Sequence, residues 1–474
     1  MFKKLLVLSI AIILVFIGML IFTEEKSLNR EISEKFICQI DFASWMGKTF
    51  KISPDSKRVA CVANAGNKWF VVIDGKEEMQ YDGIGALIFS PDSKRVAYAA
   101  QAGNKQFVIV DGKEEMQYDG IGTLVFSPNS RRVAYAAQAG NKQFVVVDGK
   151  EETQYDGVGD NLIFSPNSKR IAYAAQAGDK VVVVVDGKEG TQYDGIGGDN
   201  LVFSPDSKRV AYAAQAGDKV VVVVDGKEGI QYDGLGEVSL VFSLDSRRVA
   251  YAAQAGNKQF AVIDGKEEKQ YDGIGSLIFS PNSRRVAYAA QAGEKQCVVV
   301  DGKEEMQYDN IGSLIFSPNS RRVAYAAQAG EKQCVIVDGK EEMQYDGIGY
   351  PVFSPNSRRM AYAVEADNKW FMVVNGKVEK QYEKVGTPVF SPDSKSAAYV
   401  AQADSKQFVI VDGKEEMQYD TIVNLEGGEP IFSAFDSLYY LGLKGQSVYL
   451  AEEKIKRSWI QTTSSTIKDI LHVR

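Results

Sequence analysis

The sequence predicts an all-β protein made of ten or eleven copies of one four-stranded unit, and three observations support this. A segment of the type Phe-Ser-Pro recurs from residue 52 to residue 390, mostly every 37 residues, as between Phe89 and Phe126, with a degenerate copy at Phe432. A fixed period of this length indicates a repeat architecture. Gly or Pro also interrupts the sequence roughly every nine residues, which excludes helices. The runs between these breaks are rich in β-branched and aromatic residues, as strands are.

The segment 121–157 shows how one unit is built. Its apolar runs cover 122–126, 132–137 and 143–147, and a more polar run covers 152–155. Turn residues separate them, at 127–130, at 139–142, at Asp148-Gly149 and at Asp156-Gly157. An Asp-Gly pair between two apolar runs is a strong hairpin signal. Four strands of about five or six residues with four short turns account for the repeat length.

The distribution of apolar residues predicts how the units pack. The second and third runs are apolar at successive positions, which is typical of strands buried on both sides. The fourth run mixes polar and apolar residues, as expected of an outer edge. Four-stranded sheets stacked face to face, each with one polar outer edge, are the blades of a β-propeller. An open β-solenoid or a stack of separate hairpins is the alternative.

The two ends of the repeat region hold complementary fragments. Residues 36–41 align with a fourth strand, whereas 431–433, 438–441 and 447–450 align with first, second and third strands. Together they predict one composite blade. Ten full repeats and this blade give about eleven units, more than the usual four to eight in a ring. The sequence leaves open one large ring or two tandem rings.

The repeat resembles that of a known family. Phe89-Ser-Pro-Asp-Ser-Lys-Arg-Val-Ala-Tyr98, and the same ten residues at 203–212, are similar to the repeat of the TolB-like, WD40-like (PD40-type) β-propellers. In that family Gly usually stands where this chain has Ser93. The resemblance covers roughly residues 50–450 and implies the propeller fold. Such propellers serve as binding platforms, envelope proteins and gating domains of peptidases, so the fold does not define one function.

The N-terminus is predicted to be a separate segment. Lys3 and Lys4 precede an uncharged run from Leu5 to Phe22, which as a helix would span roughly 27 Å, close to the hydrocarbon core of a bilayer. We therefore expect a transmembrane anchor at 1–23, a tether at 24–35, the propeller at 36–456 and a tail at 457–474. The paired lysines place the repeats on the periplasmic or extracellular side. A cleaved signal, and hence secretion, is the alternative.

The composition argues against several kinds of chemistry. His472 is the only histidine, which disfavours Ser-His-Asp and Cys-His catalysis as well as histidine metal centres. Acidic and basic residues alternate within each repeat around a net charge of −7, so no basic stripe for nucleic acid is expected. Cys297 and Cys334 occupy positions that carry Phe in other repeats, which predicts small buried side chains; a disulfide between neighbouring units is the alternative. We expect no enzyme activity and no cofactor.

Differences between the repeats point to a recognition surface. The connections after the fourth strand vary most, and the turn after the second strand also varies. In a propeller both loop sets lie on one face, and binding residues come preferentially from loops on a rigid scaffold. The predicted function is a non-enzymatic binding module at the cell envelope for a protein, peptide or glycan. The alternative is a carboxylate-only or calcium-dependent enzyme, for example one that acts on glycans, that uses the channel mouth. The candidate binding residues are Asp160, Asn161, Asp199, Asn200, Glu237 and Tyr350.

Overall fold

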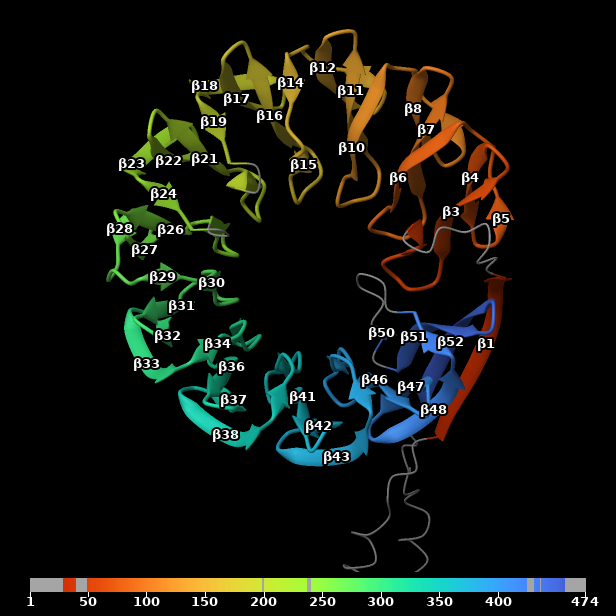
Figure 1. Ribbon diagram of the computed structural model, residues 1–474, viewed down its shortest axis with the longest axis vertical. Coiled ribbons are helices and arrows are strands. Elements are labelled where there is room, and N and C mark those ends of the chain that lie inside the picture. The colour runs from red at the N-terminus through yellow and green to blue at the C-terminus, as the bar shows by residue number, and fades with distance from the viewer. Residues whose placement is uncertain are drawn as a thin grey trace, which may run out of the picture.

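A computed structural model describes residues 29–39, 49–197, 200–236, 240–423, 430–434 and 436–456. The strands of these residues form eleven sheets of four or five strands each. Figure 1 shows the sheets as the blades of one closed ring. The structure thus selects one large ring and excludes two tandem rings. In chain order the ten blades formed by consecutive strands are β2–β5 (51–77), β6–β9 (83–114), β10–β13 (120–151), β14–β18 (157–193), β19–β23 (195–232), β24–β28 (234–267), β29–β33 (273–308), β34–β38 (310–345), β39–β43 (347–382) and β44–β48 (384–419).

The third blade represents the common plan. Strands β10 (Gly120–Phe126), β11 (Val133–Ala139), β12 (Lys142–Val147) and β13 (Lys150–Glu151) pair in chain order and antiparallel. The first strand lies nearest the ring centre and the fourth lies outermost (Figure 1). Asp148 and Gly149, between β12 and β13, have φ of 52° and 75°. Positive φ at both central residues is what a type I′ hairpin turn requires, so the predicted turn is confirmed.

The hydrophobic core is divided among the seams between blades. In β8 (Lys105–Val110), Phe107 and Ile109 pack in the seam with the preceding blade, whereas Val108 and Val110 pack in the seam with the following blade. Both sides of the strand are therefore buried, which explains its unbroken apolar run.

A composite blade closes the ring. Strand β1 (Asn29–Gln39) pairs antiparallel with β52 (Ser447–Lys456), which pairs with β51 (Ser437–Lys444). The inner strands are β49 (Thr421–Ile422) and β50 (Ile431–Ala434). This confirms the predicted composite blade and contradicts an open solenoid. The predicted tether is too long, because residues 29–35 belong to β1, where they pair with β52 beyond the length of an ordinary fourth strand.

The turn between the first two strands joins each blade to the next. Ser93 has a φ of 65°, a conformation that favours glycine. Its Oγ accepts a hydrogen bond from the backbone N–H of Asp55 in the preceding blade, at 2.9 Å. A glycine could adopt the turn but could not accept this bond. Here Ser therefore supplies a contact between blades that the glycine usual in the TolB-like repeat cannot make.

Several sequence expectations concern the cysteines and the chain ends. All four cysteines are buried and free, which confirms the small apolar role of Cys297 and Cys334 and excludes the disulfide between them. No helix among the described residues is long and apolar enough to cross a membrane. The predicted anchor, the tail at 457–474 and His472 lie outside the described residues.

Candidate functional site on the variable-loop face

The ring has two faces, defined by the loops that each carries. One face holds the turns between second and third strands and the connections from each fourth strand to the next blade; we call it the variable-loop face. The other holds the turns between first and second strands, such as 90–95, and the turns between third and fourth strands, such as 111–112; we call it the Ser-Pro face. The strands run antiparallel, so successive turns alternate between these faces.

A hydrogen-bonded chain stiffens the variable-loop face. Asp119, in the connection between the second and third full blades, accepts a bond from Lys105 Nζ at 2.7 Å and one from the backbone N–H of Gly140 at 2.7 Å. Lys105 and Gly140 belong to the second-to-third turns of successive blades, so both loop sets share one face, as predicted. The Lys105 bond, followed by the Gly140 bond, lowers the pKa of Asp119. The carboxylate therefore stays ionised as part of the framework.

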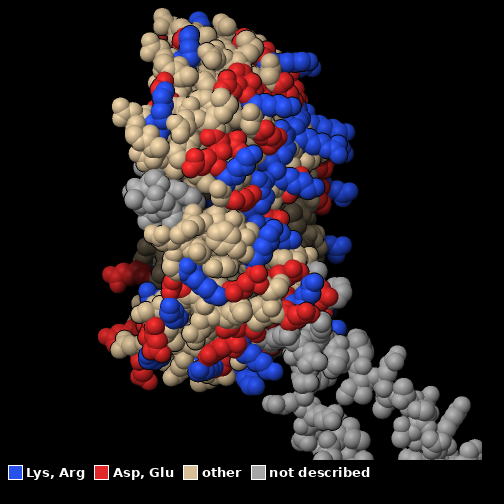
Figure 2. Space-filling view, turned by 90° about the vertical axis from the view of Figure 1, so that its right-hand side faces the viewer, with Lys and Arg blue, Asp and Glu red and all other residues tan. Residues whose placement is uncertain are grey.

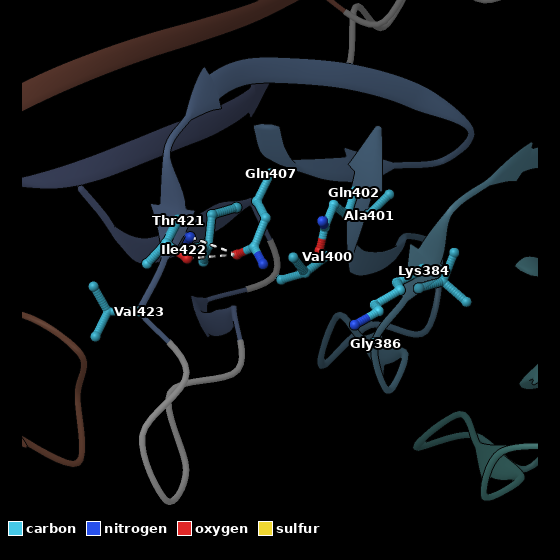
Figure 3. A pocket seen from close by; sticks show the side chains of 10 residues that line it. Lys384, Gly386, Val400, Ala401, Gln402, Gln407, Thr421, Ile422 and Val423 are labelled. Atoms are coloured by element: carbon cyan, nitrogen blue, oxygen red, sulfur yellow. Dashed lines mark hydrogen bonds between the residues drawn. The ribbon is translucent and has the colours of Figure 1, made fainter. Parts of the chain in front are cut away.

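Similar notches recur along the inner rim of the variable-loop face. Each notch lies between the first strand of one blade and that of the next. One, about 470 Å³, lies between the tenth full blade and the composite blade. Figure 3 shows Gln407 between the segment 421–423 on one side and Val400 and Lys384 on the other. Equivalent residues form a notch of about 370 Å³ between the second and third full blades. They form another of about 240 Å³ between the third and fourth.

A glutamine from the third strand lines each of these notches and accepts a hydrogen bond from the next blade. Gln407 Oε1 accepts the backbone N–H of Ile422 at 2.7 Å and the hydroxyl of Thr421 at 3.4 Å. Gln106 Oε1 makes the same bond to the backbone N–H of Ile121 at 2.9 Å. The remaining walls are mainly Gly, Ala, Val and Ile, with few charged side chains. Such a notch can receive a small apolar or amide-bearing group, but it brings no acid and base together.

The predicted site residues differ in their exposure and in their contacts. Asp160 is exposed and lines the 240 Å³ notch, and its backbone oxygen accepts a bond from Thr123 Oγ1 at 3.0 Å. Asn161 and Asn200 are half-buried, and the Asn200 N–H closes a turn onto the Gly197 oxygen at 3.1 Å. Tyr350 is 62% exposed, at the same repeat position as Thr123. Asp199 and Glu237 lie outside the described residues.

Sequence reasoning missed the glutamines that build the notches. Glutamine stands at the second position of most third strands, but Val181 and Val220 replace it in the fourth and fifth full blades, and Trp69 and Trp370 replace it in the first and ninth. The fourth and fifth blades lie beside the lengthened connections at 197–200 and 236–240. A position-by-position comparison of third strands would have revealed this joint change. The rim lacks the glutamine beside these two connections, whereas Gln407 is kept beside the longer connection at 423–430.

Catalytic chemistry is weakly represented in the part of the chain that the structure describes. No group of three His, Cys, Asp or Glu side chains there could hold a metal ion. Burial, and then the Glu114 hydrogen bond, raises the pKa of Tyr81 to about 12. Tyr81 donates that bond at 3.0 Å across a seam, and equivalent pairs join other blades. Such a repeated contact is structural, since a catalytic residue is expected at one place in the ring.

Comparison with known proteins does not identify a family for this chain. No protein-family model matches the chain, and no curated protein matches it. Among solved structures, the chain is similar to a eukaryotic initiation factor (14% identity, 68% of this chain and 95% of that chain, TM-score 0.39). It is also similar to the Dos1 propeller (12% identity, 63% of this chain and 92% of that chain, TM-score 0.33). A third similar structure is TolB from Acinetobacter baumannii (14% identity, 52% of this chain and 77% of that chain, TM-score 0.25). With TM-scores below 0.5 these similarities carry no argument, so the propeller assignment rests on the strand pairing and the TolB-like family stays a resemblance of the repeat.

Proposed function

We propose that this protein is a non-enzymatic binding scaffold that recognises a protein, peptide or glycan through the variable-loop face. The observation that carries the proposal is the position of the notches: they recur on the face where the repeats differ most. Constant bonds such as those of Asp119 hold the loops in place. A rigid framework with variable loops is the usual arrangement of a recognition surface.

The proposal includes a cellular setting. The run from Leu5 to Phe22, with Lys3 and Lys4 before it, supports an anchor that holds the ring at the periplasmic or extracellular side of a membrane. A scaffold in this position would gather its partner at the cell envelope. Secretion after cleavage of the same segment would leave the recognition face unchanged.

The test is capture from membranes of the native host with the full-length chain as bait. The variant carries Asp160→Ala, Asp199→Ala and Glu237→Ala, and the matched control carries Asn, Asn and Gln at the same positions. We expect one stoichiometric partner with the native chain and at least a tenfold loss with the alanine variant. Partial retention by the control would assign the remaining affinity to the shape of the side chains. An identical set of captured proteins with all three baits would overturn the proposed role of this rim.

A further inference from the structure

The Ser-Pro face carries an inner ring of exposed cations. In each of the ten full blades, the first-to-second turn places one Lys or Arg after its left-handed Ser. Nine of them are exposed: Lys94, Arg131, Lys169, Lys208, Arg247, Arg284, Arg321, Arg358 and Lys395. In five turns the residue two positions earlier is Asn rather than Asp, as at Asn319 before Arg321. Those five turns present a cation without a carboxylate of their own.

A second ring of cations surrounds the first. Every third-to-fourth turn ends in an exposed Lys: Lys76, Lys113, Lys150, Lys188, Lys227, Lys266, Lys303, Lys340, Lys377 and Lys414. The Asp of the same turn is already occupied: Asp111, for example, accepts a bond from Arg95 Nε at 2.8 Å. This bond also joins the two turns and so places both rings on one face. Figure 2 shows Lys and Arg gathered toward one face of the ring.

The variable-loop face has the opposite tendency. Its repeated lysines are held by carboxylates, as in the pair of Lys105 and Asp119. Its second-to-third turns add exposed acids in several blades, including Asp179, Asp218 and Glu294. The ring is therefore polarised from one face to the other, although an exposed Glu, such as Glu114, follows most lysines of the outer ring.

Two further features of the Ser-Pro face suit a lipid surface. Leu244 replaces the Pro of the other turns and is 61% exposed. Strand β1 pairs antiparallel with β52, from Asn29 opposite Lys456 to Gln39 opposite Ser447. Because Ser447 follows a second-to-third turn, Gln39 lies at the variable-loop end of the blade and the start of β1 lies at the Ser-Pro end. Strand β1 therefore begins at the face that carries the cations, and the predicted anchor precedes β1 in the sequence.

We propose that the Ser-Pro face lies against an anionic lipid bilayer and that the variable-loop face points away from it. Cations spread in rings over one face match a planar layer of negative headgroups, whereas a linear polyanion is usually tracked by a stripe or groove. The exposed leucine adds an apolar group that lipid accepts and a hydrated polymer does not. This orientation stands apart from the identity of the partner, and it leaves the recognition face free.

The test measures how closely each face approaches lipid. The full-length chain is placed in nanodiscs of phosphatidylcholine alone or with 30% phosphatidylglycerol (about one anionic lipid in three), both doped with a headgroup quencher. Because the native cysteines are buried, a fluorophore can be attached at Lys150→Cys on the Ser-Pro face or at Asn104→Cys on the opposite face. We expect at least twofold stronger quenching at Lys150→Cys in the anionic discs, reversed by 0.5 M salt, and no change at Asn104→Cys.

A matched pair of charge variants makes the result specific. Arg284→Gln, Arg321→Gln and Arg358→Gln remove three positive charges from the Ser-Pro face and should abolish the extra quenching. The control Asn67→Asp, Asn141→Asp and Asn257→Asp changes the net charge equally on the opposite face, with a residue that other repeats use there, and should leave quenching intact. Equal quenching in both lipids, or an equal loss with both variants, would overturn the proposal. Polyphosphate binding that needs the three arginines, without lipid-dependent quenching, would assign the cations to a soluble polyanion instead.

Discussion

Substitution of Arg95 would test whether contacts between blades hold the ring together. Its Nε donates to Asp111 Oδ2 at 2.8 Å within its own blade. Its Nη1 reaches the next blade and donates to the backbone oxygens of Ser130 and Arg131 at 3.1 and 2.9 Å. The guanidinium carbon also lies 5.3 Å from the centre of the Phe126 ring. One side chain therefore ties two blades together.

The expected loss can be estimated from these contacts. The ion pair is 29% and 42% exposed, so it contributes only about 0.5 kcal/mol. Two bonds to carbonyl oxygens add about 1 kcal/mol each, and the ring contact adds about 0.5 kcal/mol. We expect Arg95→Ala to lower the free energy of unfolding by about 2–3 kcal/mol. Arg95→Lys should restore only the ion pair, because Lys lacks the planar fork.

The measurement is urea unfolding, followed by tryptophan fluorescence and by circular dichroism. Coincident transitions justify a two-state free energy. Lys94→Ala serves as the control, because Lys94 is exposed on the same turn and should change stability by less than about 0.5 kcal/mol. Equal stability of Arg95→Lys and the native chain would refute the geometric argument, since charge alone would then suffice. No loss with Arg95→Ala would show that this contact does not hold the ring.

Three further predictions concern ring closure and burial. The carboxylate of Glu34 accepts bonds from Lys444 Nζ at 2.6 and 2.8 Å. Burial raises the pKa of Glu34, but the bonds to Lys444 and Tyr419 outweigh it, and the net pKa is lowered. Glu34→Gln should therefore lower the free energy of unfolding by about 1 kcal/mol at pH 7. That cost should vanish in urea melts as the pH falls through the lowered pKa, because the stabilisation exists only while Glu34 is ionised. Gly442→Ala would place a Cβ 2.0 Å from the Tyr419 ring and should cost about 3 kcal/mol in the same melts, whereas Gly386→Ala meets nothing closer than 3.7 Å and should be nearly neutral. All four thiols are buried, so a thiol reagent at pH 8 should label them only after unfolding, and labelling of the native ring would contradict the seam packing.

The repeat made most of the fold predictable. Its period, the Asp148-Gly149 hairpin and the complementary chain ends indicated blades and a composite closure, and the strand pairing confirms them. The number of rings was not predictable, because it depends on the small angle between successive blades. That angle arises from packing in seams such as the one that contains Tyr118 and Phe144, and every seam has nearly the same residues.

The candidate site was less accessible from the sequence. Loop variation indicated the variable-loop face, and Asp160 does line a notch there. The glutamines were overlooked because a residue present in most repeats looks structural when variation is the criterion. Gln407 shows the weakness of that criterion, since it lines the 470 Å³ notch and accepts a bond from the Ile422 backbone.

The polarity of the ring shows what a linear reading of charge conceals. Along the chain, acids and bases alternate within each repeat, which indicates an even mixture. Successive turns, however, alternate between the two faces, so first and third turns accumulate on one face while second and fourth turns accumulate on the other. Lys94 and Lys113, from a first and a third turn, lie on the same face, whereas Asp119 lies opposite. The charges of the first and third turns, summed separately from those of the second and fourth turns, would have predicted a cationic face and an acidic one. In an up-and-down repeat, charge is therefore segregated in space when basic and acidic turns alternate along the sequence.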